Sequence, residues 1–119
     1  MATLSFQAFA WECNAPKGVL VREGVFEIKK DGLDVSHIDI YVSAPEEIEG
    51  RQFDGTFVLW VKNDKDWKLA TFIPSIKLGN RYTAHFSGHT KFLKSVVLEA
   101  GYHDKELKYG CHIEARHKF

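Results

Sequence analysis

Polar side chains that could carry acid–base chemistry alternate along residues 37–43. His37, Asp39, Tyr41 and Ser43 occupy every second position, and every second residue of a β-strand points to the same face. Neighbouring side chains of such a row lie about 7 Å apart, close enough to surround a small ligand. A small enzyme could use His37 with Asp39, and Tyr41 could contact a ligand. The same alternation is also typical of the solvent side of a half-buried strand, so both interpretations stay open.

The cysteines and histidines form no known catalytic or metal-binding motif. The chain has two cysteines and six histidines, without CxxC, HExxH, GxSxG or a phosphate-binding glycine loop. Cys111 and His112 are neighbours in a predicted strand and therefore point to opposite faces, so they cannot act as nucleophile and base. We expect no cofactor, no metal site and no catalytic residue. Cys13 and Cys111 are expected to be buried thiols, which would pair only if the terminal strands were neighbours.

Aromatic residues give the strongest indication of a binding surface. Strands at 55–62 and 67–73 are predicted to form a hairpin around a four-residue loop. In this register Lys62 opposes Trp67, and Trp60 opposes Leu69. One face of the ribbon is then a core face: Phe57, Leu59, Val61, Ala70 and Phe72. The opposite face is also largely apolar: Val58, Trp60, Trp67, Leu69 and Thr71.

A ribbon that is apolar on both faces is either covered by a second layer of protein or exposes one face to something else. The second layer could come from the same chain. Otherwise the face could bind another copy or a protein partner, with tryptophan as the anchor. It could also stack a sugar or another planar group on Trp60 and Trp67, between Lys62 and Asp66.

The elements that must position these residues are short β-strands. Alternation with a period of two, interrupted by turn residues about every ten positions, predicts about eight of them. The first is expected at 3–13, and the one helical turn that the pattern allows is expected near 45–50. The predicted fold is therefore all-β, an antiparallel β-sandwich of jelly-roll-like form in a single domain over 1–119, with a closed barrel as the second choice.

Several turns are marked by glycine. Residues 19–30 are expected to form one long or two short strands interrupted at Gly24. Asp31-Gly32 is expected to form a hairpin turn, and Gly79-Asn80 to precede a strand at 81–86. Pro74 should end its strand or place it at a sheet edge, because proline lacks the N–H that a central strand needs.

The last hairpin, of residues 92–102 and 107–117, is predicted from its own turn. With Asp104-Lys105 as a two-residue loop, Tyr102 faces Leu107 and the two faces of the ribbon separate by charge. The uncharged face is Val96, Leu98, Ala100, Tyr102, Leu107, Tyr109, Cys111 and Ile113. In this register His103 and His112 lie roughly 20 Å apart and cannot share an ion.

Charge narrows the range of partners. Lys plus Arg and Asp plus Glu are 16 each, so the chain has no general positive field for duplex nucleic acid. The N-terminal residues lack the pattern of a signal peptide, and no apolar stretch approaches the ~20 residues that span a bilayer. We therefore expect a cytoplasmic protein that binds neither duplex nucleic acid nor a membrane.

Two short segments resemble a known family. Residues 9–13 (FAWEC) and 69–75 (LATFIPS) are similar to parts of the nucleoplasmin core, and this resemblance implies a β jelly roll that assembles as a ring. The acidic tract that the family uses for basic partners is missing, and residues 107–117 add a further strand. The resemblance therefore favours the jelly roll among sandwiches and implies no function.

Together these patterns predict a binding or assembly protein. The leading hypothesis is that the chain associates with itself or docks a partner through the apolar face that contains Val58, Trp60, Trp67 and Leu69. A carbohydrate-binding or small-molecule-binding module that uses Trp60, Trp67 and Tyr41 is the alternative. The enzyme with His37 and Asp39 is the third hypothesis.

Overall fold

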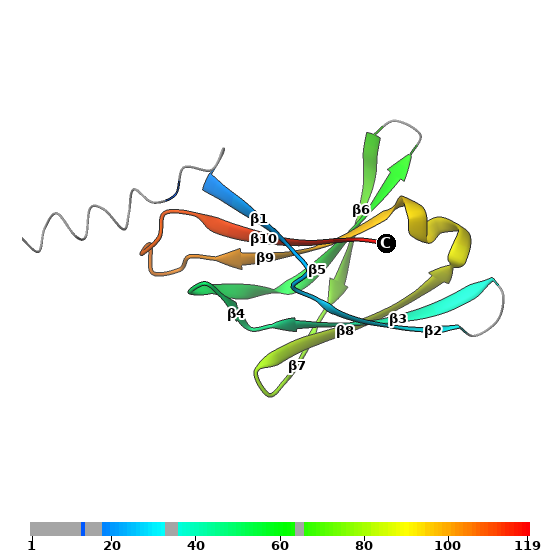
Figure 1. Ribbon diagram of the computed structural model, residues 1–119, viewed down its shortest axis with the longest axis horizontal. Helices are drawn as coiled ribbons and strands as arrows, with labels where there is room; N and C mark the ends of the chain where they lie inside the picture. Colours follow the sequence, from blue (N-terminus) through cyan, green and yellow to red (C-terminus); the bar gives the residue numbers. More distant parts are fainter. Residues whose placement is uncertain (1–12, 14–17, 33–35, 64–65) are drawn as a thin grey trace, which may run out of the picture.

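Ten strands and one short 3-10 helix make up the described part of the chain (Figure 1). The computed structural model describes residues 13, 18–32, 36–63 and 66–119, and for residues 62, 63, 66–69 and 92 it describes the backbone alone. The predicted strand at 3–13 lies outside the described residues except for Cys13. The elements are β1 (Val19–Glu23), β2 (Glu27–Gly32), β3 (His37–Pro45), β4 (Glu47–Ile48), β5 (Arg51–Asn63), β6 (Asp66–Pro74), β7 (Ile76–Leu78), β8 (Arg81–His89), η2 (Thr90–Ser95), β9 (Val96–His103) and β10 (His112–Lys118).

The strands form two sheets, which confirms the prediction of a nearly all-β chain. The first sheet has the order β1-β10-β9-β5-β4, and β6 also pairs with β5; the second has the order β2-β3-β8-β7. Pairing is antiparallel except between β1 and β10, which run parallel, so the purely antiparallel prediction is wrong at this edge. A parallel pair needs a long connection, and here almost the whole chain lies between the two strands.

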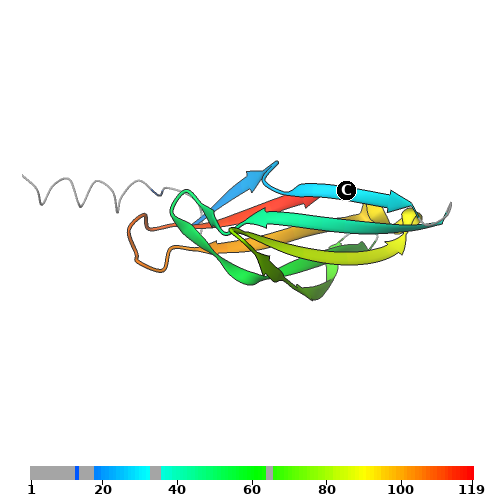
Figure 2. The same ribbon diagram turned by 90° about the horizontal axis from the view of Figure 1, so that it is seen from below.

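The inner faces of the two sheets share one apolar core (Figure 2). Alternate residues of β3 point inward from the second sheet, and alternate residues of β5, β9 and β10 point inward from the first. The Tyr102 hydroxyl donates a 2.6 Å hydrogen bond across the core to the Pro45 carbonyl, and burial raises the pKa of this phenol. The fully buried core side chains include Ile40, Val42, Ala44, Phe57, Leu98, Ala100, Tyr102, Ile113 and Ala115.

Most of the predicted turns are confirmed. Gly24, with φ of 73°, separates β1 from β2. β2 and β3 form the predicted hairpin, although Asp31 and Gly32 still pair with Asp39 and Ile38, so the turn comes after them. Gly79-Asn80 joins β7 to β8. β6 ends at Pro74, and within the described residues its only partner strand is β5.

The helical turn expected near 45–50 is wrong. Residues 47–48 form β4, and the turn after it places Glu49 and Gly50 at φ of 49° and 83°, in the left-handed region that a right-handed helix excludes. Within the described ranges helical structure occurs instead in η2, at residues 90–95. The side chain of His89 accepts a 3.1 Å hydrogen bond from the Lys91 backbone N–H and caps this helix.

The register predicted for the last hairpin is wrong by six residues. Tyr102 pairs with Ile113 instead of Leu107, and residues 104–111 form a loop. A shift by an even number leaves each side chain on its predicted face, so Leu98, Ala100 and Tyr102 are buried as expected. Leu107, however, is 81% exposed in the loop.

The new register also brings two histidines together. The rings of His103 and His112 lie 4.9 Å apart between centroids, so the expected separation of roughly 20 Å is wrong. The cause is the loop itself, because Asp104 and His112 close it: the Asp104 backbone N–H donates a 3.0 Å hydrogen bond to Nδ1 of His112.

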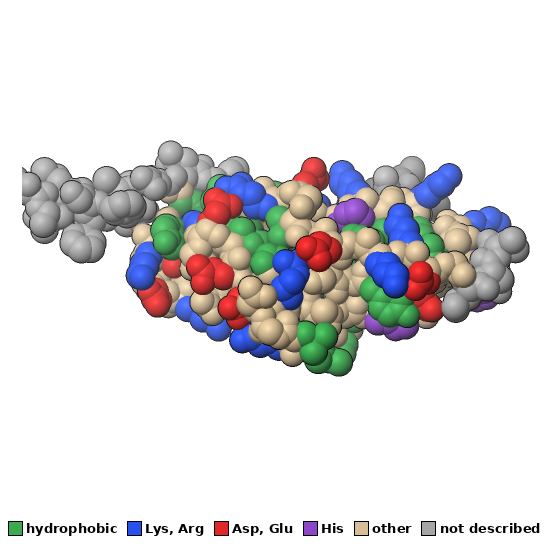
Figure 3. All heavy atoms as spheres, turned by 60° about the horizontal axis from the view of Figure 1, so that its bottom comes forward, with side chains coloured by type: hydrophobic (Ala, Val, Ile, Leu, Met, Phe, Trp, Pro, Cys, Tyr) green, Lys and Arg blue, Asp and Glu red, His purple; other side chains and the backbone are tan. Residues whose placement is uncertain are grey.

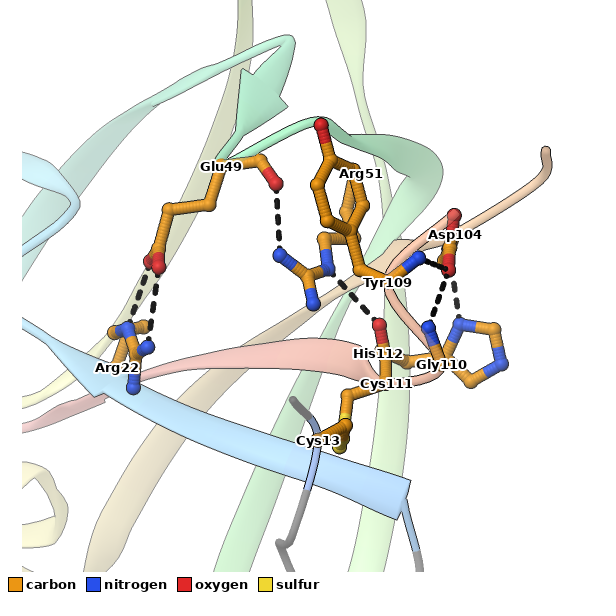
Figure 4. The surroundings of a disulfide bond; sticks show 9 residues. All are labelled: Cys13, Arg22, Glu49, Arg51, Asp104, Tyr109, Gly110, Cys111 and His112. Atoms are coloured by element: carbon orange, nitrogen blue, oxygen red, sulfur yellow. Dashed lines mark hydrogen bonds and ion pairs between the residues drawn. A yellow bond between two sulfur atoms is a disulfide. The ribbon is translucent and has the colours of Figure 1, made fainter. Parts of the chain in front are cut away.

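A disulfide joins Cys13 to Cys111, so the expectation of two free buried thiols is wrong (Figure 4). Their Cα atoms are 5.5 Å apart, within the usual range for such a bond. From the sequence, the two cysteines are expected to pair only if the terminal strands are neighbours. These strands are neighbours: β1 follows Cys13 and lies beside β10, which follows Cys111.

A buried arginine braces the same end of the molecule. Arg51 is 6% exposed, and its guanidinium donates to the carbonyl oxygens of Cys111 at 2.9 Å and Glu49 at 2.8 Å. The Tyr109 ring covers it at 4.4 Å, and Gly50 leaves the room for that ring, since a Cβ there would lie 2.4 Å from it. Figure 4 shows these side chains closing around the disulfide. We interpret this cluster as structural, because protein groups satisfy the guanidinium.

Candidate functional site

The predicted Trp60 surface is divided by a β-bulge in the hairpin of β5 and β6. Lys62 pairs with Trp67 as predicted, but the register shifts between Val61 and Lys62, so Trp60 pairs with Ala70 and Leu69 pairs with Val61. Directly opposed residues of two strands share a face. The backbone register therefore removes Leu69 from the Trp60 row, and the side chains of Trp67 and Leu69 are outside the described set.

The same bulge moves Ala70 and Phe72 to the outer face of the first sheet. Val58 pairs with Phe72, and Trp60 pairs with Ala70. Both β6 residues had been predicted in the core, and that prediction is wrong: Phe72 is 70% exposed, and Ala70 is exposed as well. Val58 and Trp60 remain on the apolar outer face, as expected, and are partly buried.

Next to Trp60 on this outer face lies a cluster of charged side chains from β9 and β10. The Trp60 indole N–H donates a 2.9 Å hydrogen bond to one carboxylate oxygen of Glu99. The other oxygen of Glu99 accepts from Nε of Arg116 at 3.2 Å. A terminal nitrogen of Arg116 lies 3.6 Å from the Glu114 carboxylate. Arg116 thus lies between two carboxylates, and Glu99 fixes the edge of the indole ring.

These side chains surround a cavity of about 310 Å³, which is at the lower end of the range for small-molecule sites. Its lining is Trp60, Val97, Glu99, Glu114, Arg116 and Lys118. One aromatic ring, two acids and two bases therefore face one small space. Among the predicted site residues whose side chains the structure describes, Trp60 lines it and Val58 and Tyr41 do not.

Burial raises the pKa of Glu99 to about 7, and the hydrogen bond to Glu114 and the charge of Glu114 add to the rise. Arg116 and the Trp60 N–H act in the opposite direction and are outweighed. At neutral pH Glu99 is therefore protonated to a large extent, and the cluster carries less negative charge than two full carboxylates would.

The raised pKa makes stability depend on pH. Between pH 4.5 and 7 folded Glu99 holds more proton than unfolded Glu99, so the free energy of unfolding falls as the pH rises through this window. We expect a fall on the order of 1 to 3 kcal/mol. Glu99→Gln cannot ionise, so it should lose this slope and exceed the wild type most at pH 8. Denaturant unfolding at pH 4.5 and 8 measures the free energy of unfolding of wild type and Glu99→Gln. Glu106→Gln, at an exposed glutamate, is the control. Parallel pH profiles for wild type and Glu99→Gln would contradict the expectation.

Tyr41 lies elsewhere, on the outer face of the second sheet, so the predicted set does not form one site. Its ring stacks on His85 with centroids 4.7 Å apart, and the Lys29 amine lies 5.9 Å from its centre. A shallow groove of about 630 Å³ runs from here to the exposed Pro74, Ile76 and Leu78. The stack and the three apolar side chains could contact a ligand or another protein.

In the polar row on β3, Asp39 contacts a histidine of another strand and not His37, the partner that the sequence suggested. Asp39 contacts Nε2 of His85 at 3.1 Å, while His37 lies beside Ser36 at 3.1 Å and beside the ring of His89. Tyr41 and His85 are directly paired across β3 and β8. Asp39 therefore orients His85 rather than His37, and the enzyme hypothesis in its predicted form finds no support in this geometry.

Three large apolar side chains are exposed in succession along β6 and β7. Phe72, Ile76 and Leu78 are 70%, 68% and 62% exposed. β6 borders the first sheet and β7 borders the second, and in the described part of the chain each pairs on one side alone. The two strands follow one another with only Ser75 between them (Figure 1). We call residues 70–78 the β6–β7 edge.

Charge protects little of this edge, whose single charged residue, Lys77, pairs with Glu46 at 3.0 Å. Residues 69–76 contain no charged side chain, whereas exposed edge strands usually carry lysine or another charge that prevents pairing. Figure 3 shows acidic and basic side chains interspersed over the rest of this side of the molecule, with the hydrophobic side chains in separate groups. Pro74 is the one edge-blocking residue in the run.

The described residues contain no group of three or more His, Cys, Asp or Glu side chains that could hold a metal ion. Among the helices of these same residues, none is long and apolar enough to cross a membrane.

Comparisons of the chain with protein-family models, curated proteins and solved structures find no match. The resemblance of residues 9–13 and 69–75 to the nucleoplasmin core thus has no support from a family model. The function has to be argued from the surface itself.

Three residues of these surfaces were missed from the sequence: His85, Glu99 and Arg116. Each lies on a strand face that alternation alone assigns to solvent. The partners of His85 and Glu99 come from strands distant in sequence, whereas Arg116 meets Glu99 inside the β9–β10 hairpin, whose register was predicted wrongly. The signal that could have found them is the pairing of β3 with β8 and of β5 with β9, which no local pattern encodes.

Proposed function

We propose that the chain is an assembly protein that pairs with a second copy of itself through the β6–β7 edge. The observation that carries the proposal is the exposure of Phe72, Ile76 and Leu78 along an edge whose single charged residue is Lys77. Removing such side chains from water favours an association by roughly 25 cal/mol per Å² of apolar surface, a gain that must exceed the loss of rotational, translational and side-chain freedom on binding. The proposal keeps the predicted assembly role but moves the contact from the Trp60 face to the neighbouring edge.

A second copy fits this edge better than a charged partner. Two β6 strands related by a twofold axis would pair antiparallel, and each would present the same residues to the other. Because residues 69–76 carry no charge, this self-pairing brings no like charges together. The N–H and C=O groups on the outer side of β6 would gain strand partners, and Phe72 would pack against its symmetry mate.

The test is the solution mass of wild type and edge variants by size-exclusion chromatography with light scattering. The wild type should have at least twice the 13.6 kDa of one chain. Phe72→Asp and Ile76→Lys should each give a single-chain mass, because a charge would be buried without a partner in the paired edge. Both residues are exposed in the single chain, so the fold should remain.

Leu107→Asp is the matched control. Leu107 is 81% exposed but lies in the 104–111 loop, away from the edge, so this variant should keep the wild-type mass. A wild type that stays a single chain at its highest soluble concentration would overturn the proposal. Equal loss of assembly in Leu107→Asp and Phe72→Asp would also overturn it.

We further propose that the two sheets constitute a β-sandwich of the predicted jelly-roll-like form. The shared core of inward residues from β3 and from β5, β9 and β10 supports a sandwich. The parallel β1–β10 pair is compatible with it, because it lies at the border of one sheet.

The cytoplasmic location expected from the sequence stays a prediction, and the disulfide favours another. Disulfides form and persist in oxidising compartments and are rare in reducing ones. We propose on the basis of the Cys13–Cys111 bond that the protein matures in an oxidising environment. Alkylation of free thiols in protein taken directly from its native source tests this, and full labelling of both cysteines would contradict it.

A further inference from the structure

The cavity beside Trp60 has three features of a ligand site that assembly at the β6–β7 edge does not use. It offers an aromatic ring, it places charged groups of both signs around that ring, and its volume of about 310 Å³ suits a small molecule. The side chains are held in place: Glu99 fixes the indole edge at 2.9 Å and Arg116 at 3.2 Å. A ring that is already fixed loses little conformational freedom when a ligand binds.

We propose that this cavity binds a neutral carbohydrate, with one sugar ring stacked on Trp60. The C–H face of a pyranose is apolar and flat and packs against an indole, while its hydroxyl groups need hydrogen-bond partners around the rim. Glu114, Arg116 and Lys118 provide acceptors and donors there. A guanidinium has five N–H donors, so the two contacts of Arg116 to carboxylates leave donors for sugar hydroxyls.

The charge around the cavity decides between ligand classes. Two acidic residues, Glu99 and Glu114, and two basic residues, Arg116 and Lys118, line the same space, so a charged ligand would meet a group of its own sign as well as its opposite. A cation would have to displace Arg116 from its two carboxylates, and an anion would lie against Glu114. A neutral ligand with hydroxyl groups disturbs neither ion pair and can bond to both.

Carbohydrate binding and assembly use different surfaces. Pairing at the β6–β7 edge would extend the first sheet and leave its outer face open. Phe72 is not among the residues that line the cavity. A failure of one proposal therefore leaves the other testable, and each has its own variants.

The first experiment screens wild-type protein on an array of neutral, acidic and amino sugars as disaccharides, followed by calorimetric titration of the best neutral binder. Trp60→Ala should weaken this binding about tenfold or more, and Trp60→Phe should weaken it less because it keeps an aromatic face. Tyr41→Ala is the matched control, since Tyr41 is an aromatic residue of the opposite outer face, and binding should be unchanged. Phe72→Asp should also bind like the wild type.

Circular dichroism of each variant checks that the fold is kept, and Trp60→Phe keeps the test decisive if Trp60→Ala unfolds. Binding to the array with no neutral sugar among the ligands would overturn the proposal. Unchanged affinity in both Trp60 variants would overturn it too, as would a loss of binding in Tyr41→Ala, which would place the ligand in the groove of the second sheet.

Discussion

Replacing Asp104 by alanine is expected to lower the free energy of unfolding by about 3 to 5 kcal/mol. The Asp104 side chain is nearly fully buried, and its carboxylate accepts three backbone hydrogen bonds inside one loop. Lys108 donates at 3.0 Å, Tyr109 at 2.8 Å and Gly110 at 2.9 Å. Alanine leaves these N–H groups without their acceptor, so the loop that leads into Cys111 loses the three hydrogen bonds that hold it together. Denaturant unfolding at pH 7 measures the effect.

The pH dependence gives this prediction a signature of its own. Burial opposes ionisation of Asp104, but the backbone N–H groups of Tyr109, Lys108 and Gly110 and the charge of Arg51 outweigh it and lower its pKa below 3.8. A lowered folded-state pKa gives stability that is present above pH 3.8 and is lost as the pH falls through the folded value. The difference between wild type and Asp104→Ala should therefore shrink below that pH.

Glu106→Ala is the control for Asp104→Ala. Glu106 is an exposed carboxylate in the same loop, paired only with Lys108 at the surface, so its loss should have little effect. Asp104→Asn should fall between the two because an amide keeps one acceptor oxygen. A loss in Asp104→Ala no larger than in Glu106→Ala would show that the loop does not depend on this carboxylate.

The loop of Asp104 also explains why the C-terminal hairpin was only half predictable. Alternation correctly assigned Leu98, Ala100 and Tyr102 to the buried face, because burial of a strand face depends on local pattern. It could not decide between registers that differ by an even number of residues. The choice was made by the Asp104 carboxylate, which stabilises an eight-residue loop, and by pairing of Ala115 with Ala100.

The prediction for the β5–β6 hairpin was partly wrong for a related reason. The pair Lys62–Trp67 was predicted correctly, but Asn63 and Asp66 of the predicted four-residue loop pair with each other, and one extra residue in β6 shifts the rest of the strand. A bulge changes which residues share a face, so Phe72 became exposed and the supposed Trp60–Leu69 row was divided. Sequence alternation has no signal for this bulge, since Ala70, Thr71 and Phe72 fit either face.

The residues that contact Trp60 and Tyr41 could not be predicted from the sequence, because they depend on which strands pair in the fold. Trp60 was selected because it lies on the second apolar face of its predicted hairpin, and Tyr41 because it belongs to a row of polar residues on one strand face. Their partners Glu99 and His85 are 39 and 44 residues away, and each was brought there by a neighbouring strand. The two-sheet fold could be predicted from alternation and turns, whereas which side chains meet on its outer faces required the strand order.

Reduction of the Cys13–Cys111 disulfide is expected to lower the free energy of unfolding by about 4 kcal/mol. The bond spans 98 residues, so it removes much of the conformational freedom of the unfolded chain. It also ties the chain just before β1 to the residue just before β10. Denaturant unfolding with and without reductant measures the loss in the wild type. Cys13→Ser should show the same loss without reductant and no further change when reductant is added.

The location of the disulfide predicts which strand opens first after reduction. β1 lies at the border of the first sheet, and within the described residues its strand partner is β10 alone, in the parallel pair. The Arg22–Glu49 ion pair at 2.8 Å is exposed and adds little. Without the disulfide, the covalent connection between β1 and β10 is the long chain segment that lies between them, so β1 should open locally more often. Hydrogen exchange should therefore accelerate in residues 19–23 well before it does in β9, whose Leu98 and Ala100 are in the core. Uniform acceleration across both strands would show instead that the disulfide acts only on global unfolding, and an unchanged rate in β1 would show that pairing with β10 holds this edge by itself.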